Sequence, residues 1–204
     1  MLLEVHPNNP QPRYIARAVE VIKTGGVIIY PTDTVYGIGC SIYDRQAIER
    51  VYQIKRQDRG KPFSFICSDL SHISEYAKVA NSAFRIMKHL IPGPYTFILP
   101  ASNLKQLPKS MISKRKEVGI RVPDNIICRE LLRGVGHAIL NASAEDEHGD
   151  LLNDPELIYR RYENQIDLML DGGHSLLELS TVLDLTNEQP VVLREGAGDL
   201  QSIL

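Results

Sequence analysis

The stretch from Val27 to Cys40, VIIYPTDTVYGIGC, joins an apolar run to a polar, glycine-containing turn. Val27 to Tyr30 predict a short buried strand, which Pro31 ends because proline has no N–H for the sheet. Three small hydrogen-bonding side chains follow: Thr32, Asp33 and Thr34. Gly37 and Gly39 would let the backbone come close to another group. Ligands of open α/β sheets bind beyond the carboxyl ends of strands, so this turn is either a binding site or an ordinary loop.

Four cationic residues lie within seven positions in the sequence Lys55-Arg56-Gln57-Asp58-Arg59-Gly60-Lys61. Such a cluster can neutralise a polyphosphate, and arginine adds planar two-pronged contacts. The alternative is that these cations offset the negative C-terminal end of the preceding helix. The chain has neither the GxxxxGK[ST] phosphate loop nor the GxGxxG dinucleotide fingerprint, which excludes both of those binding motifs.

Two further side chains could carry chemistry at strand ends. Arg121, in GIRVP, is a lone arginine near the end of an apolar strand. A charge in that position needs a ligand or a structural carboxylate as its partner. Ser143, in LNASAED, follows a short strand and is either a site residue or part of a surface turn.

Strand and helix patterns alternate along the chain and predict an α/β fold with a mixed, twisted sheet. Helical spacing covers Ile15 to Ile22, and Asp44 can cap a second helix. A helix from Ser82 would turn Phe84, Met87 and Leu90 inward. Two more helices are predicted at 125–133 and after Asp154-Pro155. The other expected strands are 63–67, 95–99, 118–122, 138–140, 168–170, 181–185 and 191–193.

Composition fits one domain that spans residues 1–204, with 43% hydrophobic and 24% charged residues. No apolar run approaches the roughly 20 residues that a membrane helix needs. The N-terminal sequence MLLEVHPNNPQPR lacks a secretory signal pattern. Cys40, Cys67 and Cys128 show no CxxC spacing, and we interpret them as buried thiols of a cytoplasmic protein.

Charge is uneven although the net charge is only −2. Segments 45–61 and 105–133 are basic, whereas 145–171 is acidic. The basic segments either form solvated faces or converge on a groove for phosphates or nucleic acid.

Taken together, these motifs resemble the YrdC/YciO family, the threonylcarbamoyl-AMP synthases. PTDTVYGIGC is similar to the family's opening signature, and Lys55 with Lys61-Pro62 matches its KxR-x-P-x-x-KP motif. Other matches are GIRVP, Ser143 of an S-x-N motif, Ser180-Thr181-Val182-Leu183-Asp184, and Arg194-Glu195-Gly196. PGPYTFIL also matches, and we interpret this segment as structural. They occur in the family's order from Ile15 to Gly196.

Three positions depart from the family pattern and resemble its YciO branch. Gln57 stands where the family has an arginine, and Arg56 or Arg59 could compensate for the lost charge. Ile66 stands where many members have a histidine that touches threonine. Glu145 replaces an asparagine, and its carboxylate would repel ATP phosphates unless it bound Mg²⁺ or turned away.

The resemblance implies a single YrdC-like domain with helices packed on a twisted open mixed sheet and a concave basic face. It implies that L-threonine, bicarbonate and ATP, carried with Mg²⁺, give threonylcarbamoyl-AMP and pyrophosphate for tRNA modification. The threonine-binding residues would be Thr32, Thr34, Arg121 and Ser180. Those that bind the nucleotide would be Lys55, Gln57, Lys61, Ser143, Glu145 and Arg194, of which Lys55, Lys61 and Ser143 would be catalytic.

A second hypothesis is that the protein binds double-stranded RNA or tRNA and has weak synthase activity or none. The same resemblance implies it, because members of the family are associated with RNA. No residue set at metal-ligand spacing was found, and no membrane partner is expected.

Overall fold

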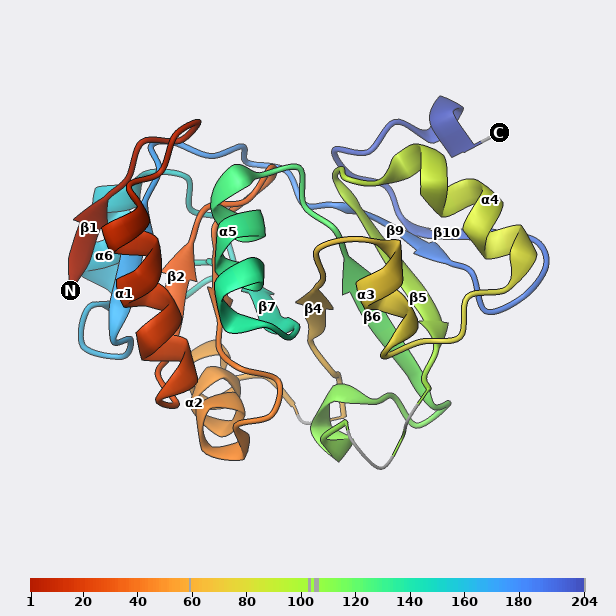
Figure 1. Cartoon of the computed structure of the whole chain (residues 1–204), viewed down its shortest axis with the longest axis horizontal. Coiled ribbons are helices and arrows are strands. Elements are labelled where there is room, and N and C mark those ends of the chain that lie inside the picture. Colours follow the sequence, from red (N-terminus) through yellow and green to blue (C-terminus); the bar gives the residue numbers. More distant parts are fainter. Residues whose placement is uncertain (59, 103, 105–106, 204) are drawn as a thin grey trace.

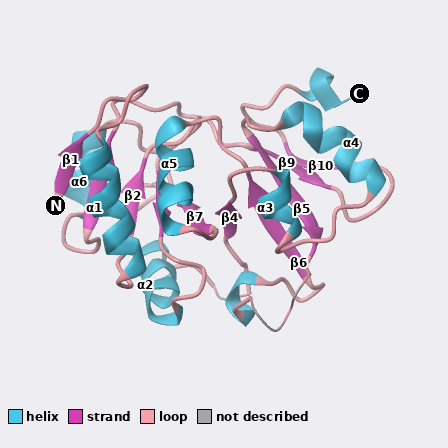
Figure 2. Cartoon of the chain, in the orientation of Figure 1, coloured by secondary structure: helices cyan, strands magenta, loops and turns pink. Residues whose placement is uncertain are grey.

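A computed structural model describes residues 1–58, 60–102, 104 and 107–203 of the chain. In these residues ten strands form one open mixed sheet, with the order β1-β8-β2-β3-β7-β4-β6-β5-β9-β10 (Figures 1 and 2). The strands are β1 (Leu2–Glu4), β2 (Ile28–Tyr30), β3 (Gly37–Gly39), β4 (Ser64–Ile66), β5 (Tyr95–Pro100), β6 (Glu117–Arg121), β7 (Ile139–Ser143), β8 (Leu168–Asp171), β9 (Thr181–Asp184) and β10 (Val191–Arg194).

Six α-helices and one 3₁₀ turn in the described residues lie between these strands, and a second 3₁₀ turn follows the last strand. They are α1 (Pro12–Lys23), α2 (Arg45–Lys55), α3 (Leu70–Ser74), α4 (Asn81–Leu90), η1 (Lys109–Met111), α5 (Ile126–Val135), α6 (Pro155–Tyr162) and η2 (Leu200–Ile203). The predicted α/β class and mixed sheet are confirmed, because β1–β8, β8–β2, β4–β6 and β5–β9 pair in parallel while the other neighbours are antiparallel. No helix within these described ranges is long and apolar enough to cross a bilayer.

Two helices begin at the capping residues that the sequence predicts, Asp44 and Asp154, and a third is capped by Asn125, which the sequence predicts as helical. Asp44 accepts hydrogen bonds from the first-turn N–H groups of α2, and Asn125 does the same for α5. Asp154 caps α6 with proline at the first helical position. Helix α4 begins at Asn81, one residue before the predicted start at Ser82. Phe84 is 47% exposed, so its predicted inward direction is wrong.

The two halves of the sheet are covered differently. Ile28 and Tyr30 of β2 pack with α1 and α5 on one face, while Ile29 joins the core on the face of α2 and α6. In the other half, α3 and α4 lie over one face only (Figure 1). There β5 turns Phe97 into the core and Thr96 toward the opposite, open face, because side chains alternate along a strand.

The three cysteines are buried free thiols, as predicted. Burial raises the pKa of each thiol well above its ordinary value, because a thiolate is poorly stabilised away from water. The three thiols therefore pack as small apolar side chains.

Strand β3 was not predicted, because its sequence Gly37-Ile38-Gly39 is typical of a turn. It pairs antiparallel with β2 and with β7. A Cβ at Gly39 would lie 2.2 Å from the carbonyl oxygen of Leu140, and one at Gly37 would lie 2.3 Å from Oδ1 of Asn141. The glycines therefore let two strands approach each other, so the predicted close approach is confirmed and the group approached is strand β7.

We expect Gly39→Ala to lower the free energy of unfolding by about 2 kcal/mol or more, because strand β3 must move away from β7. Urea denaturation measures this loss. The matched control is Gly119→Ala in β6, where the added Cβ would meet its nearest atoms at an ordinary 3.4 Å. Equal losses in the two variants would contradict the close-approach argument.

Candidate functional site

A cavity of about 420 Å³ lies on the open face of β4, β6, β5 and β9. The loop after β2, the end of α2 and the segment after β7 close its sides. Eight of the predicted site residues line it: Thr34, Lys55, Gln57, Arg121, Ser143, Glu145, Ser180 and Arg194. The structure therefore brings together residues that lie up to 160 positions apart in the sequence.

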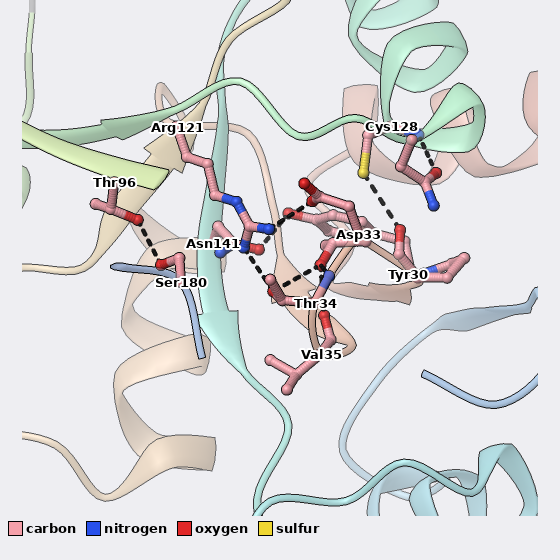
Figure 3. Close-up of polar contacts among 12 residues, drawn as sticks. Tyr30, Asp33, Thr34, Val35, Thr96, Arg121, Cys128, Asn141 and Ser180 are labelled. Atoms are coloured by element: carbon pink, nitrogen blue, oxygen red, sulfur yellow. Dashed lines mark hydrogen bonds and ion pairs between the residues drawn. The ribbon is translucent and has the colours of Figure 1, made fainter. Parts of the chain in front are cut away.

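Arg121 ties strand β6 to the loop after β2 (Figure 3). Its Nη1 donates to Oγ1 of Thr34 at 2.8 Å, and its Nη2 pairs with Oδ1 of Asp33 at 2.5 Å. The side chains of Arg121 and Asp33 are only 4% and 12% exposed. Asp33 was left out of the predicted site. The sequence could have indicated Asp33 as the partner of Arg121, since it adjoins Thr34 in the polar loop and a buried arginine needs a carboxylate partner.

Two polar atoms of this ion pair lack a hydrogen-bond partner among the described residues, Nε of Arg121 and Oδ2 of Asp33. Buried polar groups are nearly always paired, so an unpaired donor beside a cavity is where a ligand oxygen would be held. Arg121 lines the cavity, but Nε itself is buried from solvent, so an anionic ligand reaches this N–H only after a small movement of the wall.

Thr32 lies behind the cavity wall and positions the loop. Its Oγ1 donates to the carbonyl oxygen of Val35 at 2.7 Å and accepts from the N–H of Thr34 at 3.1 Å. Thr32 is not among the residues that line the cavity, so its direct contact with threonine stays a prediction. The residue shapes the turn that presents Thr34, as hydroxyl side chains do in such turns.

A second group of side chains joins β5, β9 and β10. Oγ1 of Thr96 and Oγ of Ser180 lie 2.8 Å apart (Figure 3). Arg194 donates from Nε and Nη2 to the carbonyl oxygen of Ser180 at 3.1 and 2.9 Å. Partial burial lowers the pKa of Arg194, and the nearby charge of Arg121 adds to this effect. Thr96 was not predicted, although a threonine between Tyr95 and Phe97 in a strand marks a polar face.

Lys55, at the end of α2, contacts the segment after β7 through two oxygen atoms. Its Nζ donates to the carbonyl oxygen of Ser143 at 2.7 Å and pairs with Oε2 of Glu145 at 2.7 Å. The hydroxyl of Ser143 donates to Oε1 of the same carboxylate. Glu145, whose orientation the sequence left open, therefore faces the cavity with its carboxylate held by Lys55 and Ser143.

Lys61 does not line the cavity, and its side chain is exposed. Its carbonyl oxygen instead accepts from Nε2 of Gln57 at 2.7 Å. The predicted catalytic role of the Lys61 ammonium group is therefore not supported. Arg56 ends α2 with φ +48° and borders a neighbouring hollow beside Glu145, while Arg59 lies outside the described residues.

The residues present do not fit a resident Mg²⁺ ion. No group of three or more histidine, cysteine or acidic side chains gathers in the described part of the chain. Both carboxylate oxygens of Glu145, the acid beside Lys55, already accept from Lys55 and Ser143. A magnesium ion at this site would have to arrive on a phosphate ligand.

We expect Asp33→Ala to destabilise the protein by about 3 kcal/mol or more, because it leaves the buried Arg121 charge unpaired. Urea denaturation measures the loss, and Asp33→Asn should recover part of it through a neutral hydrogen bond. Arg160→Ala breaks the exposed Glu156–Arg160 pair and should cost less than about 1 kcal/mol. Similar losses for Asp33→Ala and Arg160→Ala would contradict the proposed need for a buried counter-ion.

Several solved structures share the fold of this chain. The crystal structure of Escherichia coli YciO superposes with a TM-score of 0.94 over 100% of this chain and 99% of that chain, at 43% identity. A structure of Pyrococcus abyssi Sua5 complexed with L-threonine gives a TM-score of 0.92 at 26% identity. This chain covers 59% of the Sua5 chain.

The sequence matches agree with the structural ones. An uncharacterised protein of Haemophilus influenzae is 48% identical over 95% of this chain and 94% of its own length. The threonylcarbamoyl-AMP synthase of Pyrococcus abyssi is 28% identical over 91% of this chain and 55% of its own length. Residues 20–196 match the Sua5/YciO/YrdC family model, which is described as telomere recombination. The chain belongs to the Sua5/YciO/YrdC family.

Proposed function

We propose that the cavity binds L-threonine and ATP and forms threonylcarbamoyl-AMP and pyrophosphate. The observation that carries the proposal is that Nε of Arg121 has no hydrogen-bond partner among the described residues, while Arg121 lines the same cavity as Thr34, Lys55 and Arg194. A carboxylate can pair with Arg121 while phosphate oxygens reach Lys55 and Arg194 in the same cavity. The Sua5 complex with L-threonine supports the choice of amino acid.

In this proposal Arg121 orients the threonine carboxylate, and the hydroxyls of Thr34, Thr96 and Ser180 surround the rest of the amino acid. The amine attacks CO₂ derived from bicarbonate and loses a proton, which gives a carbamate. A carbamate oxygen then attacks the α-phosphorus of ATP, and pyrophosphate leaves with the electron pair of the broken P–O bond. The protein contributes positioning and charge stabilisation.

Lys55 and Arg194 would contact the phosphate oxygens, and Ser143 would place its hydroxyl near them. Magnesium would accompany ATP as part of the substrate. The alternative prediction, RNA binding without turnover, stays a prediction that the same protein preparation can test, since RNA affinity falls steeply with added salt.

The first experiment measures pyrophosphate release from ATP and bicarbonate with and without L-threonine, with threonylcarbamoyl-AMP identified by mass spectrometry. We expect release that depends on L-threonine. D-threonine is the matched control, since it carries the same groups in the wrong geometry. Folded protein that releases no pyrophosphate, or that releases it equally without threonine, would contradict the proposed reaction.

Kinetics of two variants separate the proposed roles of the arginines. Asp33→Asn/Arg121→Gln removes both charges of the buried pair together, so no unpaired carboxylate remains. We expect its KM for threonine to rise tenfold or more while its KM for ATP changes less than about threefold, because one charged hydrogen bond is worth ~1.5–3 kcal/mol. Arg194→Gln should instead raise the KM for ATP more than the KM for threonine. A KM for threonine that Asp33→Asn/Arg121→Gln leaves unchanged would exclude Arg121 as the carboxylate partner.

A further inference from the structure

The charges that line the cavity nearly cancel. Lys55, Arg121 and Arg194 are positive, and Glu117 and Glu145 are negative, which leaves a net charge of +1. Asp33 then neutralises Arg121 from behind the wall. A nucleoside triphosphate carries several negative charges, so the cavity as formed is poorly matched to one without accompanying cations.

The mismatch is concentrated at Lys55, whose side chain is 8% exposed. An ammonium group has three N–H donors. Oxygens of the chain itself accept two of them, the carbonyl of Ser143 and the carboxylate of Glu145. A phosphate group can therefore take one donor at most, and it would lie beside a carboxylate that repels it.

Glu145 is fixed in this position from several sides. Its carboxylate accepts from the hydroxyl of Ser143, and its carbonyl accepts from the hydroxyl of Tyr162. It also forms a β-bridge with Leu151, and the preceding residue, Ala144, donates its N–H to the carbonyl of Tyr36 at 2.9 Å. The main-chain contacts fix the backbone of Glu145, and turning the carboxylate away from Lys55 would break both the hydrogen bond from Ser143 and the ion pair.

We propose that Glu145 is a built-in counter-anion that makes this cavity select a single phosphate group, with one or two negative charges, over a polyphosphate. The preferred ligands are then a nucleoside monophosphate or an adenylate ester, in preference to a free nucleoside triphosphate. The inference rests on the proposed function only for the nucleotide character of the ligand. Within the proposed reaction it makes Glu145 a specificity-determining residue, which weakens the entry of ATP and favours retention of the adenylate product.

Calorimetric titrations with AMP and ATP in magnesium-free buffer with chelator test the selectivity directly. The wild type should bind AMP more tightly than ATP. Glu145→Gln keeps the shape and removes the charge, so it should tighten ATP binding tenfold or more and AMP binding less than threefold. The matched control is Glu147→Gln, which removes the same charge two residues away at an exposed side chain and should change neither affinity more than twofold. Glu145→Ala gives a second test if the glutamine variant does not fold.

The outcomes separate this inference from the proposed reaction. Equal gains for ATP and AMP in the Glu145 variants, a wild type that prefers free ATP, or no binding of either nucleotide would overturn the selectivity. The predicted binding order without threonine-dependent pyrophosphate release would leave the selectivity standing and reject the synthase reaction. Threonine-dependent release, together with a KM for ATP that Glu145→Gln does not lower, would support the synthase reaction and reject the selectivity.

Discussion

The need to neutralise Arg121 is the constraint on which the rest of the site depends. An arginine side chain that is 4% exposed cannot stay charged without a partner, and Asp33 supplies it from the loop after β2. This one ion pair joins two strands that are not neighbours in the sheet. It fixes the loop in which Thr32 shapes the turn and Thr34 meets the guanidinium group.

The same principle governs the other end of the cavity. Lys55 enters from the end of α2 and meets the carboxylate of Glu145, so each of the two most buried cations of the site has an internal acid. Arg194 is different, because the contacts described for it run to the carbonyl and hydroxyl oxygens of Ser180. The cavity thus offers oriented donors at low net charge, which favours recognition by geometry over simple attraction of anions.

The sequence predicted most of this frame, and the failures have identifiable causes. Apolar runs such as 168–170 and caps such as Asp44 depend on local patterns, and the structure confirms them. Strand β3 was missed because its two glycines are typical of a turn. The contacts that require glycine there come from β7, over a hundred residues away in the sequence. The three-residue strand β1 was missed because its pairing with β8 is equally remote.

Site residues show the same division between local and long-range information. Eight predicted residues meet in one cavity, although composition and spacing could not show that they converge. The partner of Arg121 was left open as a ligand or a carboxylate, and the structure supplies the carboxylate while leaving Nε for a ligand. Ile66 is fully buried in the core beside α5 and is not among the residues that line the cavity.

The most direct test of the account is whether the cavity recognises the carboxylate of threonine. Isothermal titration of L-threonine and of L-threonine methyl ester into the wild-type protein compares two ligands that differ by that charge. If Nε of Arg121 is the open donor for a carboxylate, L-threonine should bind at least tenfold more tightly than the ester. Equal binding of the two ligands, or tighter binding of the ester, would contradict the assignment of this cavity to an amino-acid carboxylate.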